Sequence, residues 1–169
     1  EVLWYRRRLQ LPDGWCERSA GPVYLEVDAC DWDCRFFLDG RPIGAHRGGY
    51  DPFVLGPLDL HPSACSPGGA ELLLRAWDPT DLGCEFTDSP PVPCDRCCEW
   101  GWQPRGKQSI RPGFIMYSGV SGLWRQGLWL ERRPTCHLHT ASAAAQPGSV
   151  AVRATAGCGQ RLSVELRLR

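Results

Sequence analysis

The sequence predicts an all-β protein, and three observations support this prediction. Apolar and polar residues alternate with a period of two over residues 23–29 and 71–77, the pattern of a strand with one buried face. An Asp39-Gly40 pair between two strand-like runs matches the type I′ turn of a tight hairpin. No stretch of useful length carries the 3.6-residue period of an amphipathic helix. Strands at this spacing are typical of a β-sandwich.

The first expected strands follow one another closely along the chain. Residues 2–11 mix aromatic and β-branched residues with arginines and end at a Pro-Asp-Gly turn, which predicts a strand. Residues 23–29 predict the second strand. Residues 35–38 and 41–46 flank the Asp-Gly turn and predict a hairpin. Residues 51–60 contain two prolines, so we expect an edge segment or a loop there.

A loop, a clear strand and a long irregular stretch come next. Residues 62–69 contain two prolines and two glycines and predict a loop. Residues 71–77 predict a strand with Leu72, Leu74 and Ala76 on one face. Regular structure then fails over residues 78–111, where five prolines occur. This stretch exceeds the about 12–15 residues usual for an unstructured loop, so it is either functional or an addition to the fold.

Regular patterns return before the C-terminus. Residues 123–132 predict a strand, and Pro134 is the expected domain boundary. Three more strands are predicted over residues 136–140, 150–155 and 162–168, with a loose turn rich in alanine and serine between the first two. The last pattern continues to the final residues, and the chain opens on glutamate rather than methionine. We therefore expect a piece of a longer protein.

Composition and charge exclude several classes of function. Lysine plus arginine number 19 and aspartate plus glutamate number 19, so no net field attracts nucleic acid or an anionic membrane. No apolar run approaches the about 20 residues of a membrane span, and no membrane partner is expected. The 10 cysteines follow no regular spacing and fall below the share that marks a disulfide scaffold. Their oxidation state and the cellular compartment stay open.

The loop after the hairpin is the stretch best suited to ligand contacts. Gly44, Gly48 and Gly49 permit backbone angles or close approaches that other residues do not. His46 and Tyr50 lie among these glycines, and a polar and aromatic loop held on paired strands commonly contacts ligands. Two roles suit His46 equally well: a hydrogen bond to a loop carbonyl, or a contact with a ligand.

Other candidate sites are weaker. Asp28, Asp31 and Asp33 lie close in sequence, but a regular strand places the first on the opposite face, so solvated or turn-stabilising aspartates are favoured over a catalytic pair. No serine lies in a nucleophile-elbow pattern. Four cysteines within residues 84–98 include a Cys-x-x-Cys pair, but their uneven spacing favours a local disulfide or free thiols over zinc. No metal and no cofactor is therefore expected.

Several motifs occur together in a fixed order. They are Leu3-Trp4-Tyr5-Arg6-Arg7, Asp31-Trp32, Asp39-Gly40, the run from Gly44 to Phe53, Asp78-Pro79-Thr80-Asp81, Gln103-Pro104-Arg105-Gly106-Lys107-Gln108, Ser121-Gly122-Leu123-Trp124 and Leu128-Trp129-Leu130-Glu131. Through these motifs residues 3–134 resemble the N-terminal sugar-binding domain of glycoside hydrolase family 2. This family includes β-galactosidases, β-glucuronidases and β-mannosidases.

The resemblance implies a fold and a set of partners. Residues 1–134 would form a jelly-roll sandwich of the galactose-binding-like type, and residues 135–169 would begin an immunoglobulin-like sandwich. A TIM barrel with two catalytic glutamates would follow in such an enzyme, and it needs about 250 residues. The chain is therefore expected to be non-catalytic. Its expected partners are carbohydrate, the missing barrel and the remainder of the immunoglobulin-like domain.

The resemblance also suggests which residues touch substrate. The candidates are Asp81, Arg105, Lys107 and Gln108, followed by His46 and Tyr50. Trp4, Trp32 and Trp124 are expected in the core. Met116 replaces an aspartate that contacts sugar in galactosidases and glucuronidases, so the sugar stays open. Residues 82–99, roughly 18 positions, are extra relative to the family and bring four cysteines; we expect a surface insertion, with a retained intron as the alternative.

Three functions compete at this point. The first is an accessory domain that shapes one wall of the active-site cleft of a retaining β-glycosidase. The second is a free-standing carbohydrate-binding module or lectin-like domain, and the two are separated by whether the gene continues into a barrel. The third is a non-catalytic adhesion or scaffold sandwich that uses residues 82–99 as its contact surface, which deletion of that segment would test.

Overall fold

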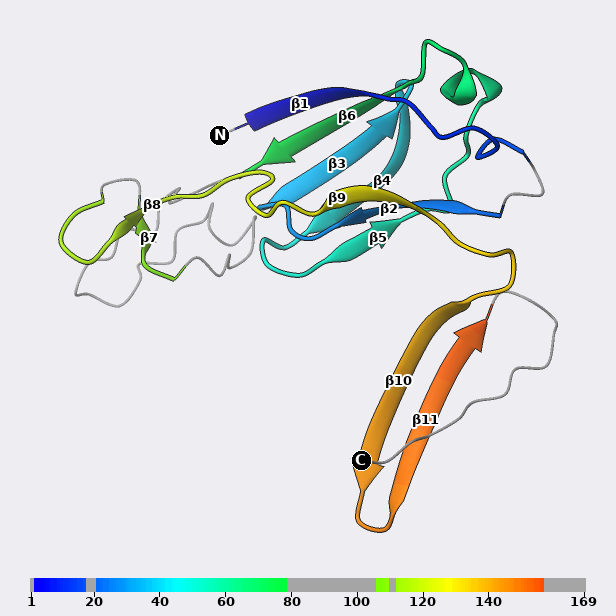
Figure 1. The fold of residues 1–169 in the computed structure, drawn as a ribbon. Helices are drawn as coiled ribbons and strands as arrows, with labels where there is room; N and C mark the ends of the chain where they lie inside the picture. Colours follow the sequence, from blue (N-terminus) through cyan, green and yellow to red (C-terminus); the bar gives the residue numbers. More distant parts are fainter. Residues whose placement is uncertain (1, 18–20, 79–105, 110–111, 157–169) are drawn as a thin grey trace.

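The structure, a computed structural model, describes residues 2–17, 21–78, 106–109 and 112–156. It is an all-β sandwich in which a four-stranded sheet faces a three-stranded sheet (Figure 1). Both sheets are antiparallel, with strand orders β1-β6-β3-β4 and β5-β2-β9. The fold class predicted from the sequence is confirmed, and the jelly-roll arrangement stays a prediction. Within the described ranges, no helix is long and apolar enough to cross a membrane.

The strands lie close to where the sequence predicts them. The four-stranded sheet contains β1 (Val2–Leu9), β3 (Asp33–Leu38), β4 (Arg41–Arg47) and β6 (Ala70–Trp77). The three-stranded sheet contains β2 (Val23–Val27), β5 (Phe53–Leu55) and β9 (Leu128–Arg132). Two further pairs are β7 (Gln108–Ser109) with β8 (Tyr117–Ser118), which run parallel, and β10 (Leu138–Gln146) with β11 (Ser149–Ala156), which run antiparallel. As predicted for a segment with two prolines, β5 is short and lies at a sheet edge.

The inner faces of the two sheets meet in one hydrophobic core. In β6, buried and half-buried residues alternate at every position, with Leu72 and Leu74 on the inner face. Phe36 of β3 is completely buried, and its ring meets that of Phe53 edge to face with centroids 5.7 Å apart. Leu25 of β2 closes the core from the opposite sheet. The period of two in the sequence therefore corresponds to the buried faces of the strands.

The hairpin predicted at Asp39-Gly40 joins β3 to β4. Asp39 has a φ of 47° and Gly40 a φ of 75°, both positive as a type I′ turn requires. The carboxylate of Asp39 also accepts a hydrogen bond of 2.8 Å from the backbone amide of Glu71, which ties the turn to β6. The register between β3 and β4 shifts once, between Phe36 and Phe37.

Two tryptophans differ from their predicted positions. Trp32 is buried in agreement with the prediction, but Trp4 is 62% exposed and Trp124 is 38% exposed. Strand β1 turns Leu3 and Tyr5 toward the core, so Trp4 between them must face outward. The strand predicted over residues 123–132 begins only at Leu128, because the residues before it form the loop that carries Trp124.

The C-terminal hairpin also differs from the prediction made from the sequence. The alanines and serine predicted as a loose turn lie inside β10 and pair with β11, and the chain reverses at Pro147-Gly148. Every residue of β10 is exposed, and the hairpin projects from the sandwich (Figure 1). Residues 162–168 lie outside the described residues. A domain boundary at Pro134 and an immunoglobulin-like second domain stay predictions.

Disulfide bonds connect several of the cysteines. Cys16 is bonded to Cys65 across 49 residues of sequence, and Cys30 is bonded to Cys34 across four. Cys136 is also disulfide-bonded. The loop predicted over residues 62–69 includes a 3-10 turn, η2 (Pro62–Cys65), whose last residue is Cys65. The sequence left the oxidation state open, and the structure shows these five cysteines to be oxidised.

Candidate functional site

One edge of the sandwich gathers the glycine-rich loop around a buried aspartate. Asp31 is 4% exposed, so of the two interpretations favoured from the sequence, a solvated or a turn-stabilising aspartate, the solvated one is wrong for it. Its backbone exchanges two hydrogen bonds with Gly122, of 2.9 Å and 2.6 Å. A Cβ on Gly49 would lie 2.7 Å from a carboxylate oxygen of Asp31, so only glycine fits there. The amide of Gly48 donates to the carbonyl of Trp32 at 2.9 Å, which fixes the start of the loop.

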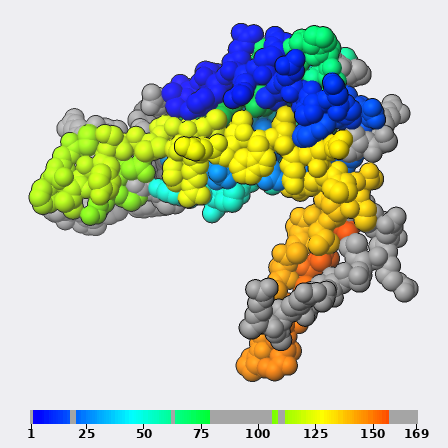
Figure 2. All heavy atoms as spheres, viewed as in Figure 1, coloured from blue at the N-terminus to red at the C-terminus, as the bar shows by residue number. Residues whose placement is uncertain are grey.

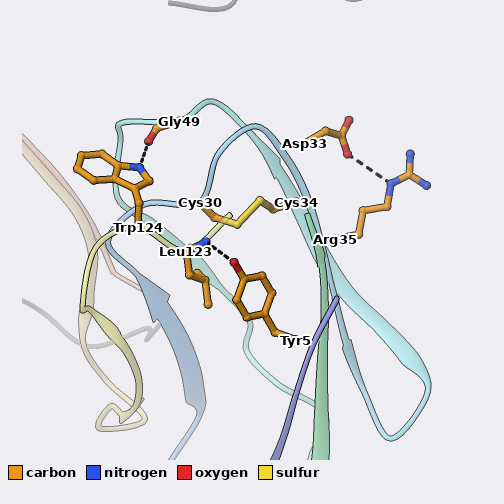
Figure 3. The surroundings of a disulfide bond; sticks show 8 residues. All are labelled: Tyr5, Cys30, Asp33, Cys34, Arg35, Gly49, Leu123 and Trp124. Atoms are coloured by element: carbon orange, nitrogen blue, oxygen red, sulfur yellow. Dashed lines mark hydrogen bonds and ion pairs between the residues drawn. A yellow bond between two sulfur atoms is a disulfide. The ribbon is translucent and has the colours of Figure 1, made fainter. Parts of the chain in front are cut away.

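Trp124 and Tyr50 form a partly exposed aromatic pair at this edge. The indole Nε1 of Trp124 donates to the carbonyl of Gly49 at 2.7 Å, as Figure 3 shows. The ring of Tyr50 meets the indole edge to face with centroids 5.9 Å apart, and Tyr50 is 41% exposed. The guanidinium of Arg125 lies 4.7 Å from the centroid of the indole. The pair is therefore held in place while keeping part of its surface open.

Two hydrogen bonds fix the loop that carries Trp124. The phenol oxygen of Tyr5 accepts from the amide of Leu123 at 3.2 Å (Figure 3). The hydroxyl of Ser121 donates to the carboxylate of Asp78, which is 2% exposed. The sequence placed Trp124 in the core and missed this arrangement. The lack of apolar alternation before residue 128 was the signal that the segment is a loop.

Gln108 connects the aromatic pair to the loop around Val120. Its Oε1 accepts from the amide of Val120 at 2.6 Å, and its Nε2 donates to the phenol oxygen of Tyr50 at 3.4 Å. The neighbouring Lys107 is exposed, and its carbonyl accepts from the amide of Tyr117 at 2.9 Å. Strands β7 and β8 lie at one end of the molecule (Figures 1 and 2). The structure thus brings Tyr50 and Gln108 together, with Lys107 beside them.

His46 belongs to a different environment. Its ring stacks on that of Phe53 at an angle of 11° with centroids 4.0 Å apart. Its Nε2 is buried and has no hydrogen-bond partner among the described residues. Burial lowers the pKa of His46, and the carboxylate of Asp51 opposes the shift. No described contact joins His46 to Tyr50, so the structure does not bring these two candidates together.

His46 is expected to make the stability of the sandwich depend on pH. Its pKa is lower in the folded protein than the reference value of 6.5, so the unfolded chain binds more protons in the window between the two values. The stabilisation that neutral His46 contributes is therefore complete above the unfolded pKa. It is lost as the pH falls through the unfolded pKa toward the folded pKa. In urea unfolding between about pH 8 and pH 5, wild type should lose stability relative to His46→Phe, which keeps a ring against Phe53. A difference that stays constant with pH would contradict a neutral, buried His46.

The remaining candidates lie outside the described residues. These are Asp81, Arg105 and the cysteines of residues 84–98, and their roles stay predictions. In the part of the chain that the structure describes, no group of three or more His, Cys, Asp or Glu side chains could hold a metal ion.

No model of a known protein family matches the sequence, and no curated protein matches it either. Solved structures do match. The β-glucuronidase of Faecalibacterium prausnitzii is 20% identical, with a TM-score of 0.56 over 94% of this chain and 27% of its own. The β-glucuronidase of Ruminococcus gnavus is 17% identical, with a TM-score of 0.57 over 92% of this chain and 24% of its own. A glycosyl hydrolase family 2 member from Bacteroides cellulosilyticus is 14% identical, with a TM-score of 0.52 over 84% of this chain and 15% of its own.

The chain shares its fold with part of these enzymes. At these identities the likeness shows the fold alone. The chain spans between 15% and 27% of the length of these three proteins, so most of each enzyme has no counterpart in it.

Proposed function

We propose that the chain is a sugar-facing, non-catalytic domain of a retaining β-glycosidase related to glycoside hydrolase family 2. The observation that carries the proposal is the fold shared with part of two β-glucuronidases, over more than nine tenths of this chain. The ordered motifs of residues 3–134 support it. In this proposal residues 1–134 line one wall of the active-site cleft and dock on a TIM barrel, and residues 135–169 begin an immunoglobulin-like domain.

The edge around Tyr50 has the chemistry that sugar contact requires. A phenol hydroxyl both donates and accepts, and the exposed ammonium of Lys107 donates, so both suit sugar hydroxyls. The partly exposed ring of Trp124 offers an apolar face for a sugar ring. Gln108 uses both ends of its amide within the protein, so in this proposal it positions Tyr50. Arg105 and Asp81 keep the substrate-contacting roles that the resemblance suggests.

The three-stranded sheet carries two neighbouring carboxylates, Glu26 and Glu131, which are not catalytic in this proposal. Glu26 and Glu131 share a hydrogen bond that raises the pKa of Glu26 and lowers the pKa of Glu131. A retaining glycosidase also needs two nearby carboxylates with separated pKa values. Here, however, Arg133 binds both, at 2.5 Å to Glu26 and 2.6 Å to Glu131, and its guanidinium lies over the ring of Tyr24. The pair is an ion-paired anchor for the chain after β9, and both carboxylates are engaged by Arg133.

The proposal is tested by expressing the chain together with the coding sequence that follows Arg169 in its gene. The extended protein should hydrolyse an aryl β-glycoside with retention of configuration, and the 169-residue chain alone should not. In the extended protein Tyr50→Phe should lower kcat/KM by about three- to tenfold, the value of one hydrogen bond. Tyr24→Phe, the same change at a buried tyrosine of β2, should stay within about twofold. Hydrolysis by the 169-residue chain, or equal effects of the two substitutions, would contradict the proposal.

A free-standing carbohydrate-binding module is the second candidate, favoured by the partly exposed pair of Tyr50 and Trp124. A module binds glycans without a barrel, whereas a cleft wall needs the rest of the enzyme. Titration of the 169-residue chain with neutral oligosaccharides, followed by tryptophan fluorescence, separates them. Saturable binding that is lost in Trp124→Ala would favour the module.

A further inference from the structure

The outer face of the four-stranded sheet carries a set of arginines that the proposed function does not use. Residues paired directly across antiparallel strands point to the same face of a sheet. Trp4 pairs with Arg75, and Arg75 pairs with Arg35, so these three form a row across β1, β6 and β3. Arg47 pairs with Asp33 at one end of the sheet. The inner residues of these strands, such as Leu74, fill the core, so the row faces outward.

Positive charge is in excess on this face. The outward-facing arginines are Arg6, Arg8, Arg35, Arg47 and Arg75, and the outward-facing acids are Asp33 and Glu71. The whole chain has a formal net charge of zero, so this imbalance is local. A local excess of one sign raises the concentration of oppositely charged ligands at a surface.

The ion pairs leave much of this positive charge available. Asp33 is shared between Arg47, at 3.0 Å, and Arg35, at 3.5 Å. The two arginine side chains are 54% and 59% exposed, while that of Asp33 is 14% exposed. One carboxylate cannot satisfy the five N–H donors of each of two guanidinium groups. Arg75 has no acidic partner among the described residues.

A pocket lies at the same place. It has a volume of about 670 Å³, and its lining includes Asp33, Arg35, Phe37, Pro42, Ala45 and Arg47. These six residues lie on the outer side of β3 and β4, around the register shift after Phe36. Figure 3 shows Asp33 and Arg35 on the side of β3 opposite to the buried Cys34. The pocket thus combines two guanidinium groups, and the carboxylate that they share, with an aromatic ring and a proline.

We propose that this outer face binds an acidic glycan, an oligosaccharide that carries carboxylate or sulfate groups. Arg35 and Arg47 hold one anionic group at the pocket, since a guanidinium fork matches the geometry of such an oxyanion. Arg75 holds a second anionic group along the row. Phe37 in the pocket and the exposed Trp4, next to Arg75 at the end of the row, pack against sugar rings beside the charges. This site does not depend on the proposed role in a glycosidase.

An acidic glycan fits these observations better than other anions. Nucleic-acid-binding domains are usually strongly basic overall, whereas this chain is neutral. An acidic peptide supplies charge without rings that stack on Trp4 and Phe37. A glycan with charged groups on its rings supplies both.

The test measures binding of the full 169-residue chain to four probes by isothermal titration calorimetry. The probes are a heparin oligosaccharide, an oligogalacturonate, a neutral galacto-oligosaccharide and poly-glutamate. We expect at least one acidic glycan to bind, more weakly as salt rises, and the neutral one not to bind. The tighter of the two acidic glycans identifies the group as sulfate or carboxylate. Tighter binding of poly-glutamate, or of a single-stranded oligonucleotide added as a fifth probe, would overturn the proposal.

Matched variants locate the binding to this face. The double variant Arg35→Gln with Arg47→Gln should weaken binding about tenfold or more, and Arg75→Gln should weaken it about threefold. Arg153→Gln makes the same charge change on the exposed strand β11 and should stay within about twofold. If the double variant melts early because Asp33 has lost its partners, Arg75→Gln decides the question, because Arg75 has no such partner to lose. Unchanged affinity in Arg75→Gln would then overturn the proposal.

Discussion

Replacing Phe36 by alanine is expected to lower the free energy of unfolding by about 3–5 kcal/mol. The side chain is completely buried between the sheets, and its ring meets Phe53 edge to face at 5.7 Å. The loss combines the burial of the ring, the cavity that alanine leaves and an aromatic contact of about 0.5–1.5 kcal/mol. Domains have about 5–15 kcal/mol of stability in total, so this one change removes a large share.

The adjacent Phe37 provides the matched control. It lies on the outer face of β3 and is half-buried, so Phe37→Ala should cost only about 1 kcal/mol. Urea unfolding followed by tryptophan fluorescence measures both variants, and an unchanged m value would show that only stability has changed. Equal losses, or a larger loss at Phe37, would mean that β3 is shifted by one residue, because such a shift exchanges the two faces of the strand.

The sequence predicts those parts of the fold that depend on local patterns. Strand β6 is found as predicted because its apolar residues fall on one face only, and the hairpin after β3 is found because Asp39-Gly40 suits a single type of turn. Trp4 could not be placed in this way. In β1 apolar and aromatic residues occur on both faces, so composition does not reveal which face is buried. That choice is made by the pairing of β1 with β6 and by the second sheet.

The candidate site was harder to predict because its contacts join distant segments. Tyr50 and Gln108 are 58 residues apart in sequence and meet through one hydrogen bond. Both were candidates from the resemblance, but their contact could not be inferred from spacing. Trp124 was missed because an aromatic residue near a strand looks like core, and only the hydrogen bond to Gly49 reveals that it supports the loop. The disulfide between Cys16 and Cys65 was not predicted, because sequence spacing does not specify the pairing of ten cysteines.

Removing the Cys16–Cys65 disulfide is expected to destabilise the protein more than removing Cys30–Cys34. The first closes a loop of 49 residues and the second a loop of four. By loop-closure entropy, the Cys16→Ser, Cys65→Ser double variant should lose about 4 kcal/mol and the Cys30→Ala, Cys34→Ala variant about 2 kcal/mol. The estimate of about 2 kcal/mol counts chain entropy alone. Removing two fully buried sulfurs also loses packing, which would raise the cost of the Cys30→Ala, Cys34→Ala variant and narrow the difference between the two variants. Urea unfolding of both variants and of the oxidised wild type measures the two losses.

Reduction of the wild-type protein distinguishes the two disulfide bonds by their exposure. Cys16 and Cys65 are half-buried, whereas Cys30 and Cys34 are both 0% exposed. A thiolate must reach a sulfur to exchange with it, so a mild reductant should open the first bond in the folded protein and leave the second intact. Alkylation and peptide mapping should therefore label Cys16 and Cys65 before Cys30 and Cys34. Simultaneous labelling of all four cysteines would instead mean that the sandwich opens as a unit before either bond is reduced.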